Sequence, residues 1–232
     1  MKRFWKCAQV AAGDSGWSIA LDGRGVRTPM RAELLVPGEA LAQAIAEEWN
    51  GQGEEVDPAS MPMTGFANAT IDRVLPAIGD FRGQIAAYAE SDLLCYRAEG
   101  PDALVARQAE AWDPLLDWAA GKLECGFVVT QGIIPVDQPA RVLAGLRDAI
   151  ERIDPWLLAG AATLVQISGT LVGTLAHLER MISADALFDA TSLDEAWQTE
   201  QWGEDAEERD RQARRRADFL NAARYCDLVV EG

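Results

Sequence analysis

Residues 4–21 read FWKCAQVAAGDSGWSIAL, and this stretch decides the fold that the sequence predicts. Apolar residues alternate with polar or small ones on both sides of GDSG at 13–16, which is typical of a hairpin loop between two strands. A second tight turn at 22–23 leads to further short strands at 26–29 and 33–36. Because two or three strands alone are marginally stable, we expect another element to cover one face of this sheet.

The expected cover is the helix that follows the strands. Pro37 stands where a helix can begin, and Leu41, Ile45 and Trp49 recur at helical spacing on one side. The loop at 54–63 contains two prolines and is too irregular to continue either a helix or a strand. We therefore expect the first domain to end at this loop.

The remainder of the chain has the apolar spacing of helices almost throughout. The helical patterns lie at 65–74, 78–89, 101–119, 142–153 and 193–202, with a last helix after residue 205. Pro114 is expected to bend the third of these or to divide it. The segment 90–97 is too short to assign, and 126–130 is a strand candidate that either joins the first sheet or forms a separate arm.

The apolar stretch 156–178 is long enough to raise the question of a membrane span. Gln166, Ser168 and His177 interrupt it, so a buried central helix is the better interpretation. Gly169 and Gly173 would lie on one face of that helix and allow another backbone to approach closely.

The predicted fold class is α+β: a small antiparallel β-rich N-terminal domain followed by a larger multihelical C-terminal domain. We expect residues 1–63 to form the small domain with its one covering helix, and residues 64–232 to form the helical domain.

The composition is that of a soluble globular protein, with 49% apolar and 25% charged residues in 232. The formal charge of −16 argues against a nucleic-acid partner and suits a basic protein partner. Cys7, Cys95, Cys125 and Cys226 stand singly, so buried free thiols are expected. The N-terminus has no apolar run behind its basic residues, which argues against a secretory signal.

The sequence contains no recognisable catalytic or metal-binding motif. Its single histidine, His177, is expected to be a hydrogen-bonded core residue. There is no Glu-x-x-His pair, no zinc-type Cys/His cluster, no Gly-x-Ser-x-Gly elbow and no phosphate loop. We therefore predict no cofactor, no metal and no catalytic residue. A carboxylate pair for hydrolysis is conceivable, but a solvated acidic face explains the clustered acids better.

The strongest candidate for a functional site is LDEAWQTEQWGED at 193–205. Two tryptophans, Trp197 and Trp202, stand five apart among carboxylates and amides. Both indoles could be core anchors with a polar tip, or they could frame an acidic recognition surface for another protein. Spacing alone favours the core role and does not decide between the two.

A series of short segments is distributed along the whole chain: LDGR (21–24), TP (28–29), LAQAIAEEW (41–49), MPMT (61–64), AN (67–68), DLLCYR (92–97), Gln108, WDPLL (112–116), SGTL (168–171), DEAWQ (194–198) and WGED (202–205). In this order, these segments resemble the ATP-twelve type of assembly chaperone for the α subunit of the F-type ATP synthase. Met63 and Phe66 stand where that family usually has Leu, and Thr170 stands where Ser is expected.

The resemblance implies a chaperone without enzymatic activity that holds the free α subunit until it joins β. It agrees with the α+β fold that the residues predict on their own. The partner-binding residues that we expect are Glu195, Trp197, Gln198, Glu200, Trp202, Glu204 and Asp205. We expect one face of their helix to pack inside the bundle while the acidic face meets the α subunit.

The resemblance and the composition also give expectations for the setting of the protein. Without a presequence, the bacterial cytoplasm is the expected compartment, or the mitochondrial matrix if a presequence has been removed. A monomer without stable membrane insertion is favoured. The alternative functions are a hydrolase with an acidic pair and an interaction module unrelated to ATP synthase.

Overall fold

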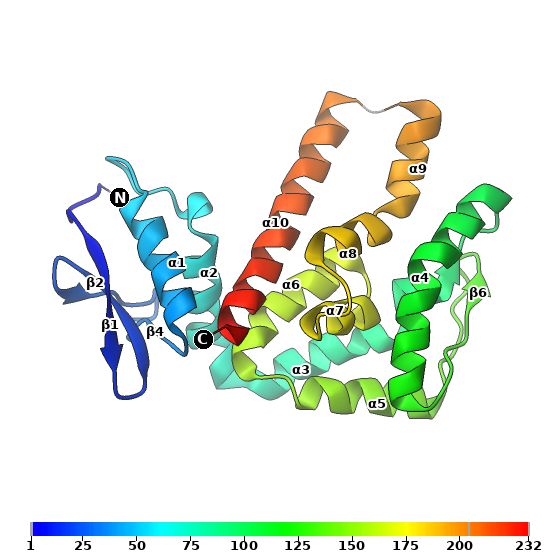
Figure 1. Ribbon diagram of the computed structural model, residues 1–232, viewed down its shortest axis with the longest axis horizontal. Helices are drawn as coiled ribbons and strands as arrows, with labels where there is room; N and C mark the ends of the chain where they lie inside the picture. The colour runs from blue at the N-terminus through cyan, green and yellow to red at the C-terminus, as the bar shows by residue number, and fades with distance from the viewer. Residues whose placement is uncertain (1, 204, 232) are drawn as a thin grey trace. The chain divides into compact units, whose positions relative to one another are not determined.

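The computed structural model describes residues 2–203 and 205–231 (Figure 1). Contacts within the chain divide it into two compact units. Unit 1 consists of residues 1–81, 154–160 and 221–232, and unit 2 consists of residues 82–153 and 161–220. The domain division after residue 63 that the sequence predicts stays a prediction.

Unit 1 contains a four-stranded sheet formed by residues near the N-terminus. β1 (Ala8–Gly13) pairs antiparallel with β2 (Gly16–Leu21), and β2 also pairs with β3 (Arg24–Gly25) and with β4 (Leu35–Val36). The antiparallel β-rich N-terminal region is therefore confirmed.

The first strand begins later than the sequence pattern predicts. The backbone N–H groups of Lys6 and Cys7 donate to the carboxylate of Asp22 at 3.0–3.2 Å. Because these donors bind a side chain, ladder pairing starts at Ala8. The same two hydrogen bonds are the main reason that the pKa of Asp22 lies below its ordinary value.

The helix α1 (Glu39–Asn50) covers the sheet, as the sequence predicts. Leu41 and Ile45 are fully buried, and so are Ile19 of β2 and Leu34 beside β4. At the end of α1, the indole of Trp5 packs edge-on against Trp49 with ring centroids 5.0 Å apart. The burial of several large aliphatic side chains, each worth ~1.5–3 kcal/mol, is what holds so small a sheet.

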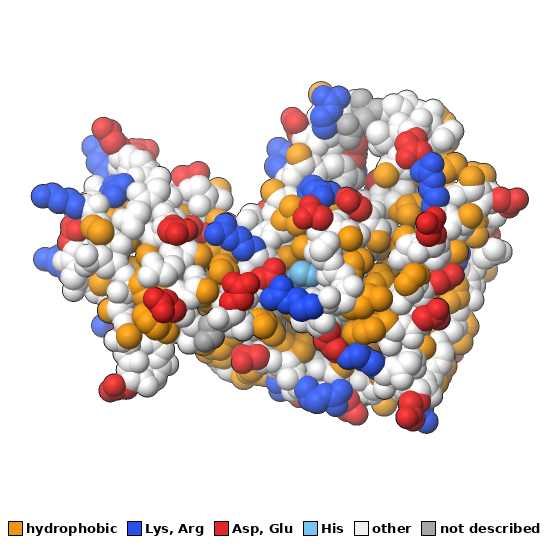
Figure 2. All heavy atoms as spheres, viewed as in Figure 1, with side chains coloured by type: hydrophobic (Ala, Val, Ile, Leu, Met, Phe, Trp, Pro, Cys, Tyr) orange, Lys and Arg blue, Asp and Glu red, His pale blue; other side chains and the backbone are white. Residues whose placement is uncertain are grey.

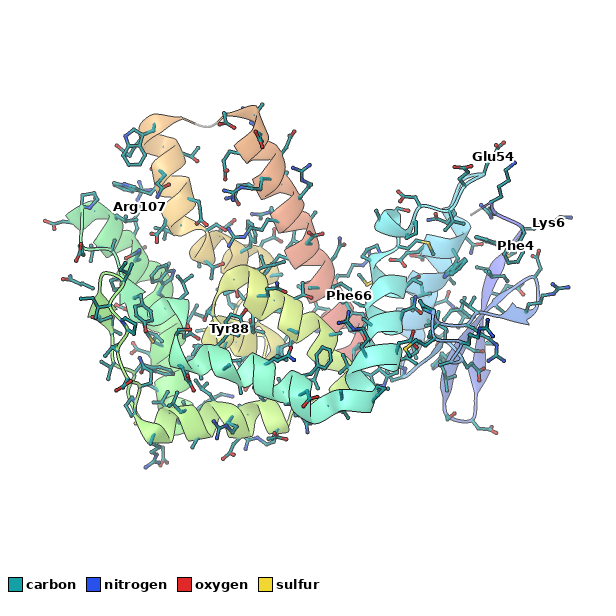
Figure 3. The ribbon with its side chains drawn as sticks, turned by 180° about the vertical axis from the view of Figure 1, so that it is seen from behind. Phe4, Lys6, Glu54, Phe66, Tyr88 and Arg107 are labelled. Atoms are coloured by element: carbon teal, nitrogen blue, oxygen red, sulfur yellow. The ribbon has the colours of Figure 1, made fainter. Side chains whose placement is uncertain are left out.

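The helical part of unit 1 is organised around Tyr225 of α10 (Ala206–Val230). The phenol lies 2.9 Å from the hydroxyl of Thr70, and its ring stacks on Phe66 of α2 (Pro62–Ala69) with centroids 5.1 Å apart (Figure 3). Burial raises the pKa of Tyr225 above its ordinary value, so the hydroxyl stays protonated and keeps this hydrogen bond.

Unit 2 is multihelical and has α4 (Asp102–Leu123) as its longest continuous helix. The helix runs unbroken through Pro114, so a division there, one of the two outcomes considered, does not occur. Pro114 is exposed, which places its ring on the solvent side, while Trp112 beside it is 1% exposed. The other α-helices of this unit among the described residues are α3 (Ile78–Ala86, only in part), α5 (Ala140–Glu151), the larger part of α6 (Leu158–Ser168), α7 (Leu171–Leu178), α8 (Ala184–Thr191), α9 (Leu193–Trp202) and the first part of α10.

The expectation of one continuous apolar helix over 156–178 is wrong. α6 (Leu158–Ser168) ends where Gly169 adopts φ +71°, and α7 begins at Leu171 with Thr170 as its cap. A left-handed conformation of this kind ends helices and suits glycine. The pairing of Gly169 with Gly173 on one helix face therefore does not exist.

The buried carboxylate of Asp92 holds the start of α7. It accepts hydrogen bonds from the backbone N–H of Val172 at 2.9 Å and of Leu94 at 3.1 Å. Burial raises the pKa of Asp92, and its hydrogen bonds act in the opposite direction. The helix break is thus stabilised from a distant part of the chain.

The strand candidate at 126–130 does not join the N-terminal sheet. Only its end pairs, as β6 (Thr130–Gln131), and its partner is β5 (Tyr96–Arg97) in parallel register. The two stretches form a separate two-stranded sheet in unit 2. The segment 90–97 accordingly contains a 3₁₀ turn followed by this short strand.

Other expectations about single residues can be compared with the structure. His177 is 3% exposed and its Nδ1 lies 3.2 Å from the carbonyl of Ile182, which confirms a hydrogen-bonded core histidine. All four thiols are free; Cys95 and Cys226 are buried as expected, whereas Cys7 is exposed. Within the described residues, no helix is both long and apolar enough to cross a membrane.

We predict that Gly160→Ala destabilises the protein although alanine favours helices. A Cβ at Gly160 would stand 2.4 Å from Sγ of Cys226 and 3.0 Å from the carbonyl of Ala222, so α6 and α10 would have to separate. The expected loss is about 1–3 kcal/mol in the free energy of unfolding, measured by urea denaturation.

The matched control is Gly65→Ala, because a Cβ at this position of α2 meets nothing within 4 Å. It should raise the free energy of unfolding by about 0.5–1 kcal/mol through helix propensity alone. Equal effects of the two substitutions would contradict close packing at Gly160.

Candidate functional site

The helix α9, which contains most of the candidate residues, is unusual in unit 2 because none of its ten residues is buried. It packs against α4 and α8 (Figure 1). Leu193 and Trp197, the expected packed face, are only partly covered. Polar contacts to other helices must therefore fix the position of α9.

The first of these contacts is a buried amide on α4. Gln108 is 0% exposed, and its Nε2 donates to Oδ1 of Asp194 at 2.7 Å. Its Oε1 accepts from the backbone N–H of Ala98 at 2.8 Å. One turn further along α4, Nε1 of Trp112 donates to the carbonyl of Ala190 at 2.7 Å. The start of α9 and the end of α8 are thus both tied to α4.

The second contact is a guanidinium that links the middle of α9 to α4. Arg107 lies over the ring of Trp197, with its Cζ 4.8 Å from the centroid. The same side chain donates to both carboxylate oxygens of Glu200 at 2.9 Å. Figure 3 shows Arg107 between the two helices, and Figure 2 shows acidic and basic side chains side by side over this region.

The third contact joins α9 to α10. Nη1 of Arg215 lies 2.9 Å from Oε1 of Glu195, and its Nη2 donates to the carbonyl of Ile167 at 2.6 Å. Arg215 therefore bridges α9, α10 and the end of α6. Both side chains of the ion pair are partly exposed, so we expect it to orient α9 rather than to contribute much stability.

A groove of about 310 Å³ lies between α9 and the first turns of α10. It is lined by Glu195, Gln198, Thr199, Trp202, Gly203, Asp205, Glu208 and Arg211. At its mouth the indole of Trp202 is 79% exposed, the largest exposed fraction of any tryptophan among the described residues. A single exposed apolar side chain is common on protein surfaces, so Trp202 is a candidate contact because it lines this groove and not because of its exposure alone.

The opposite wall of the groove combines charges of both signs. The carboxylate of Asp205 caps α10 by accepting from the backbone N–H of Glu208 at 2.8 Å. Arg211 donates to Glu208 at 2.8–2.9 Å and thereby holds the pKa of that carboxyl below its ordinary value. Glu208 is therefore ionised near neutral pH, and the wall keeps its charge pattern.

The structure thus separates the predicted residues into two sets. Trp197 and Glu200 face α4 and are engaged by Arg107, whereas Glu195, Gln198, Trp202 and Asp205 line the groove. The prediction that both tryptophans are core residues is wrong for Trp202, which is exposed, and only partly correct for Trp197, which is half-buried. Glu204 lies outside the described residues.

The sequence interpretation missed the basic residues that complete the site. Arg107, Arg211 and Arg215 come from two other helices, and Arg107 stands 93 positions from its partner Glu200. No spacing rule connects residues so far apart. The Glu–Arg pairs also weaken the idea of a catalytic carboxylate pair, because Glu195 and Glu200 are each bound by an arginine. No group of His, Cys, Asp or Glu that could hold a metal occurs in the part of the chain described.

Comparisons with known proteins agree on one family. Residues 2–120, about half of the chain, match the family described as ATP12 chaperone protein. The mitochondrial protein atp12 of Schizosaccharomyces pombe is 26% identical over 228 residues, which cover 90% of this chain and 77% of that protein.

Solved structures extend this similarity to the whole fold. Atp12 from Paracoccus denitrificans is 40% identical, with a TM-score of 0.93 and 98% of both chains covered. The Atu1473 protein from Agrobacterium tumefaciens is 37% identical, with a TM-score of 0.92 over 97% of this chain and 85% of that one.

We predict that the two tryptophans of α9 differ sharply in their effect on stability. Trp197→Ala should lower the free energy of unfolding by about 1–2 kcal/mol, because it removes partly buried apolar area and the contact with Arg107. Trp202→Ala should change it by less than about 0.5 kcal/mol. Urea denaturation of both variants checks this, and a large loss for Trp202→Ala would mean that its ring packs in solution.

Proposed function

Because this chain belongs to the ATP12 chaperone family, we propose that it binds the unassembled α subunit of the F-type ATP synthase and protects it until it assembles with β. The observation that carries the proposal is Trp202, an exposed indole at the mouth of a charged groove. The family supplies the chaperone role, and the groove supplies a surface with the chemistry that such a role requires.

An unassembled subunit exposes the apolar surface that its neighbour will cover, and such patches promote aggregation. A chaperone must bind this surface tightly enough to protect it and loosely enough to release it. A few aromatic anchors within a polar rim meet both needs, since few residues supply most of the binding energy and rim charges mainly affect encounter. Trp202 with its surrounding carboxylates has this arrangement.

The candidate residues then take different roles in the proposal. Trp202 is the anchor, and Gln198, Asp205 and Glu204 form the rim, the last of these on the basis of sequence alone. Glu195, Trp197 and Glu200 remain candidate contacts, but their intramolecular partners indicate that they also hold α9 in place. A basic residue of the α subunit would have to share these carboxylates with Arg107 or Arg215.

We further propose that the protein acts without catalysis, as a monomer, in the bacterial cytoplasm or the corresponding mitochondrial matrix. The similar proteins come from bacteria and from a mitochondrion, which supports these two compartments. A pulldown from lysate distinguishes the α subunit from an unrelated partner. A turnover abolished by Glu200→Gln would favour the hydrolase instead.

We predict that Trp202→Ala weakens binding of the purified α subunit by about tenfold or more, as expected for the loss of an aromatic anchor. Isothermal titration calorimetry at fixed ionic strength measures the affinity. Met30→Ala is the matched control, because Met30 is 71% exposed but lies in unit 1, outside the groove. The control should bind as the unchanged protein does.

Two results would contradict the proposal in different ways. If the unchanged protein does not bind the α subunit, the partner is wrong. If the unchanged protein binds the α subunit and the Trp202→Ala variant binds it equally well, the proposed partner is correct but the groove is not the binding site.

A further inference from the structure

A second exposed apolar surface lies elsewhere in unit 2, on the loop that follows α4. Nine large hydrophobic residues are exposed in the described chain, and four of them are Val128, Val129, Ile133 and Ile134. Ile133 is 94% exposed and Ile134 is 76% exposed. So many exposed aliphatic side chains within seven positions are unexpected for a surface that contacts only water.

One of these side chains, Ile133, lines an apolar groove of about 360 Å³, and Ile134 is its neighbour in the chain. Its walls come from Tyr88 at the end of the α3 segment, from Leu93 and Tyr96, and from Ile133 of the loop (Figure 3 labels Tyr88). All of these residues belong to unit 2. The groove has the size and lining that suit one or two aliphatic side chains of a bound segment.

The loop is held in place by buried polar contacts. Gln138 is 7% exposed, and its amide donates to the carbonyl of Val128 at 2.8 Å and accepts from the N–H of Val128 at 3.0 Å. β6 pairs with β5, and the N–H of Gly132 donates to the carbonyl of Arg97 at 2.8 Å. The backbone on both sides of the two isoleucines is therefore held by hydrogen bonds, which lowers the entropy cost of ordering the loop on binding.

The groove is lined mainly by two segments whose exposed charged side chains are all acidic. The two segments that form most of it, 84–100 and 126–139, are fully described. Their exposed charged residues are Glu90, Glu99 and Asp137. Glu99 lies against the groove, since a Cβ on Gly132 would stand 3.0 Å from its Oε1.

The same segments contain one cation, and it is unavailable to a ligand. Arg97 is buried and forms an ion pair with Asp113 at 2.6 Å, and Asp92 of the same segment is buried as well. The carboxylate of Glu99 beside an apolar groove, with no exposed cation on segments 84–100 and 126–139, favours a ligand that combines aliphatic and basic side chains and disfavours an acidic one.

We propose that this groove is a second binding site for the client polypeptide, and that it takes an extended segment with bulky aliphatic side chains flanked by Lys or Arg. The identity of the client rests on the function proposed above, whereas the chemistry of the segment rests on the groove. A chaperone with two separated apolar contacts gains affinity through their combined action and can release the client when either contact is lost.

The first test uses the purified α subunit and the double variant Ile133→Ser with Ile134→Ser. Both side chains are exposed, so the variant should keep its urea midpoint while its affinity for the α subunit falls by about tenfold or more. Met30→Ser with Val230→Ser removes two exposed apolar side chains outside the groove and should bind normally. Unchanged affinity of the Ile133/Ile134 variant overturns the proposal, provided that the unchanged protein binds.

The second test does not depend on the α subunit. A ten-residue peptide of alternating Leu and Lys is titrated into the full ¹⁵N-labelled chain and followed by NMR, beside a peptide with Glu in place of Lys. The Leu–Lys peptide should shift the amides of Tyr96 and Ile133, the Leu–Glu peptide should not, and the double variant should abolish the shifts. Equal shifts with both peptides, or none at these amides, overturn the proposal.

The two tests distinguish an error in the proposed second binding site from an error in the proposed function. If the unchanged protein does not bind the α subunit, the function proposed above fails, and the peptide titration still decides whether the groove takes such a segment. If the α subunit binds but neither the double variant nor the peptides behave as expected, the groove is not a client site and the function stands.

Discussion

The buried amide of Gln108 is the interaction on which the candidate surface depends. It hydrogen-bonds at once to the backbone before α4 and to the carboxylate of Asp194 at the start of α9. α9 buries none of its residues completely, so hydrophobic packing alone does not fix it. A hydrogen bond to a charged group contributes about 1.5–3 kcal/mol, and it requires defined geometry as well. This is why an exposed helix can hold one orientation on the surface of unit 2.

The loop with the exposed isoleucines repeats this arrangement. Gln138 is buried and binds both backbone groups of Val128, just as Gln108 binds two partners. In each case a buried glutamine positions a segment whose large apolar side chains remain in water: Trp202 in one, Ile133 and Ile134 in the other. Exposed apolar groups promote self-association, and the net charge of −16 opposes it through repulsion. The chain can thus keep apolar surfaces available for a client.

The sequence predicts the elements of this fold better than the contacts between them. Alternation and turn residues locate the first sheet, and the spacing of Leu41, Ile45 and Trp49 locates its cover, because these patterns are local. The sequence does not reveal the helix break at Gly169, because a continuous apolar run gives no sign of a residue with left-handed backbone conformation. The late start of β1 depends on Asp22, which is distant in the sequence.

At the candidate site, the sequence identifies the tryptophans and acidic residues of α9. The arginines that engage them lie on other helices and become visible only in the folded chain.

The most direct test of this account is hydrogen exchange of the full chain, alone and bound to the purified α subunit. The amides of α9 should exchange readily in the free protein, because no residue of this helix is buried, and they should slow markedly in the complex. The amides of the N-terminal sheet, which lie outside the proposed interface, should exchange alike in both states. Slower exchange in the sheet with no change in α9 would contradict the central claim that α9 is the binding helix.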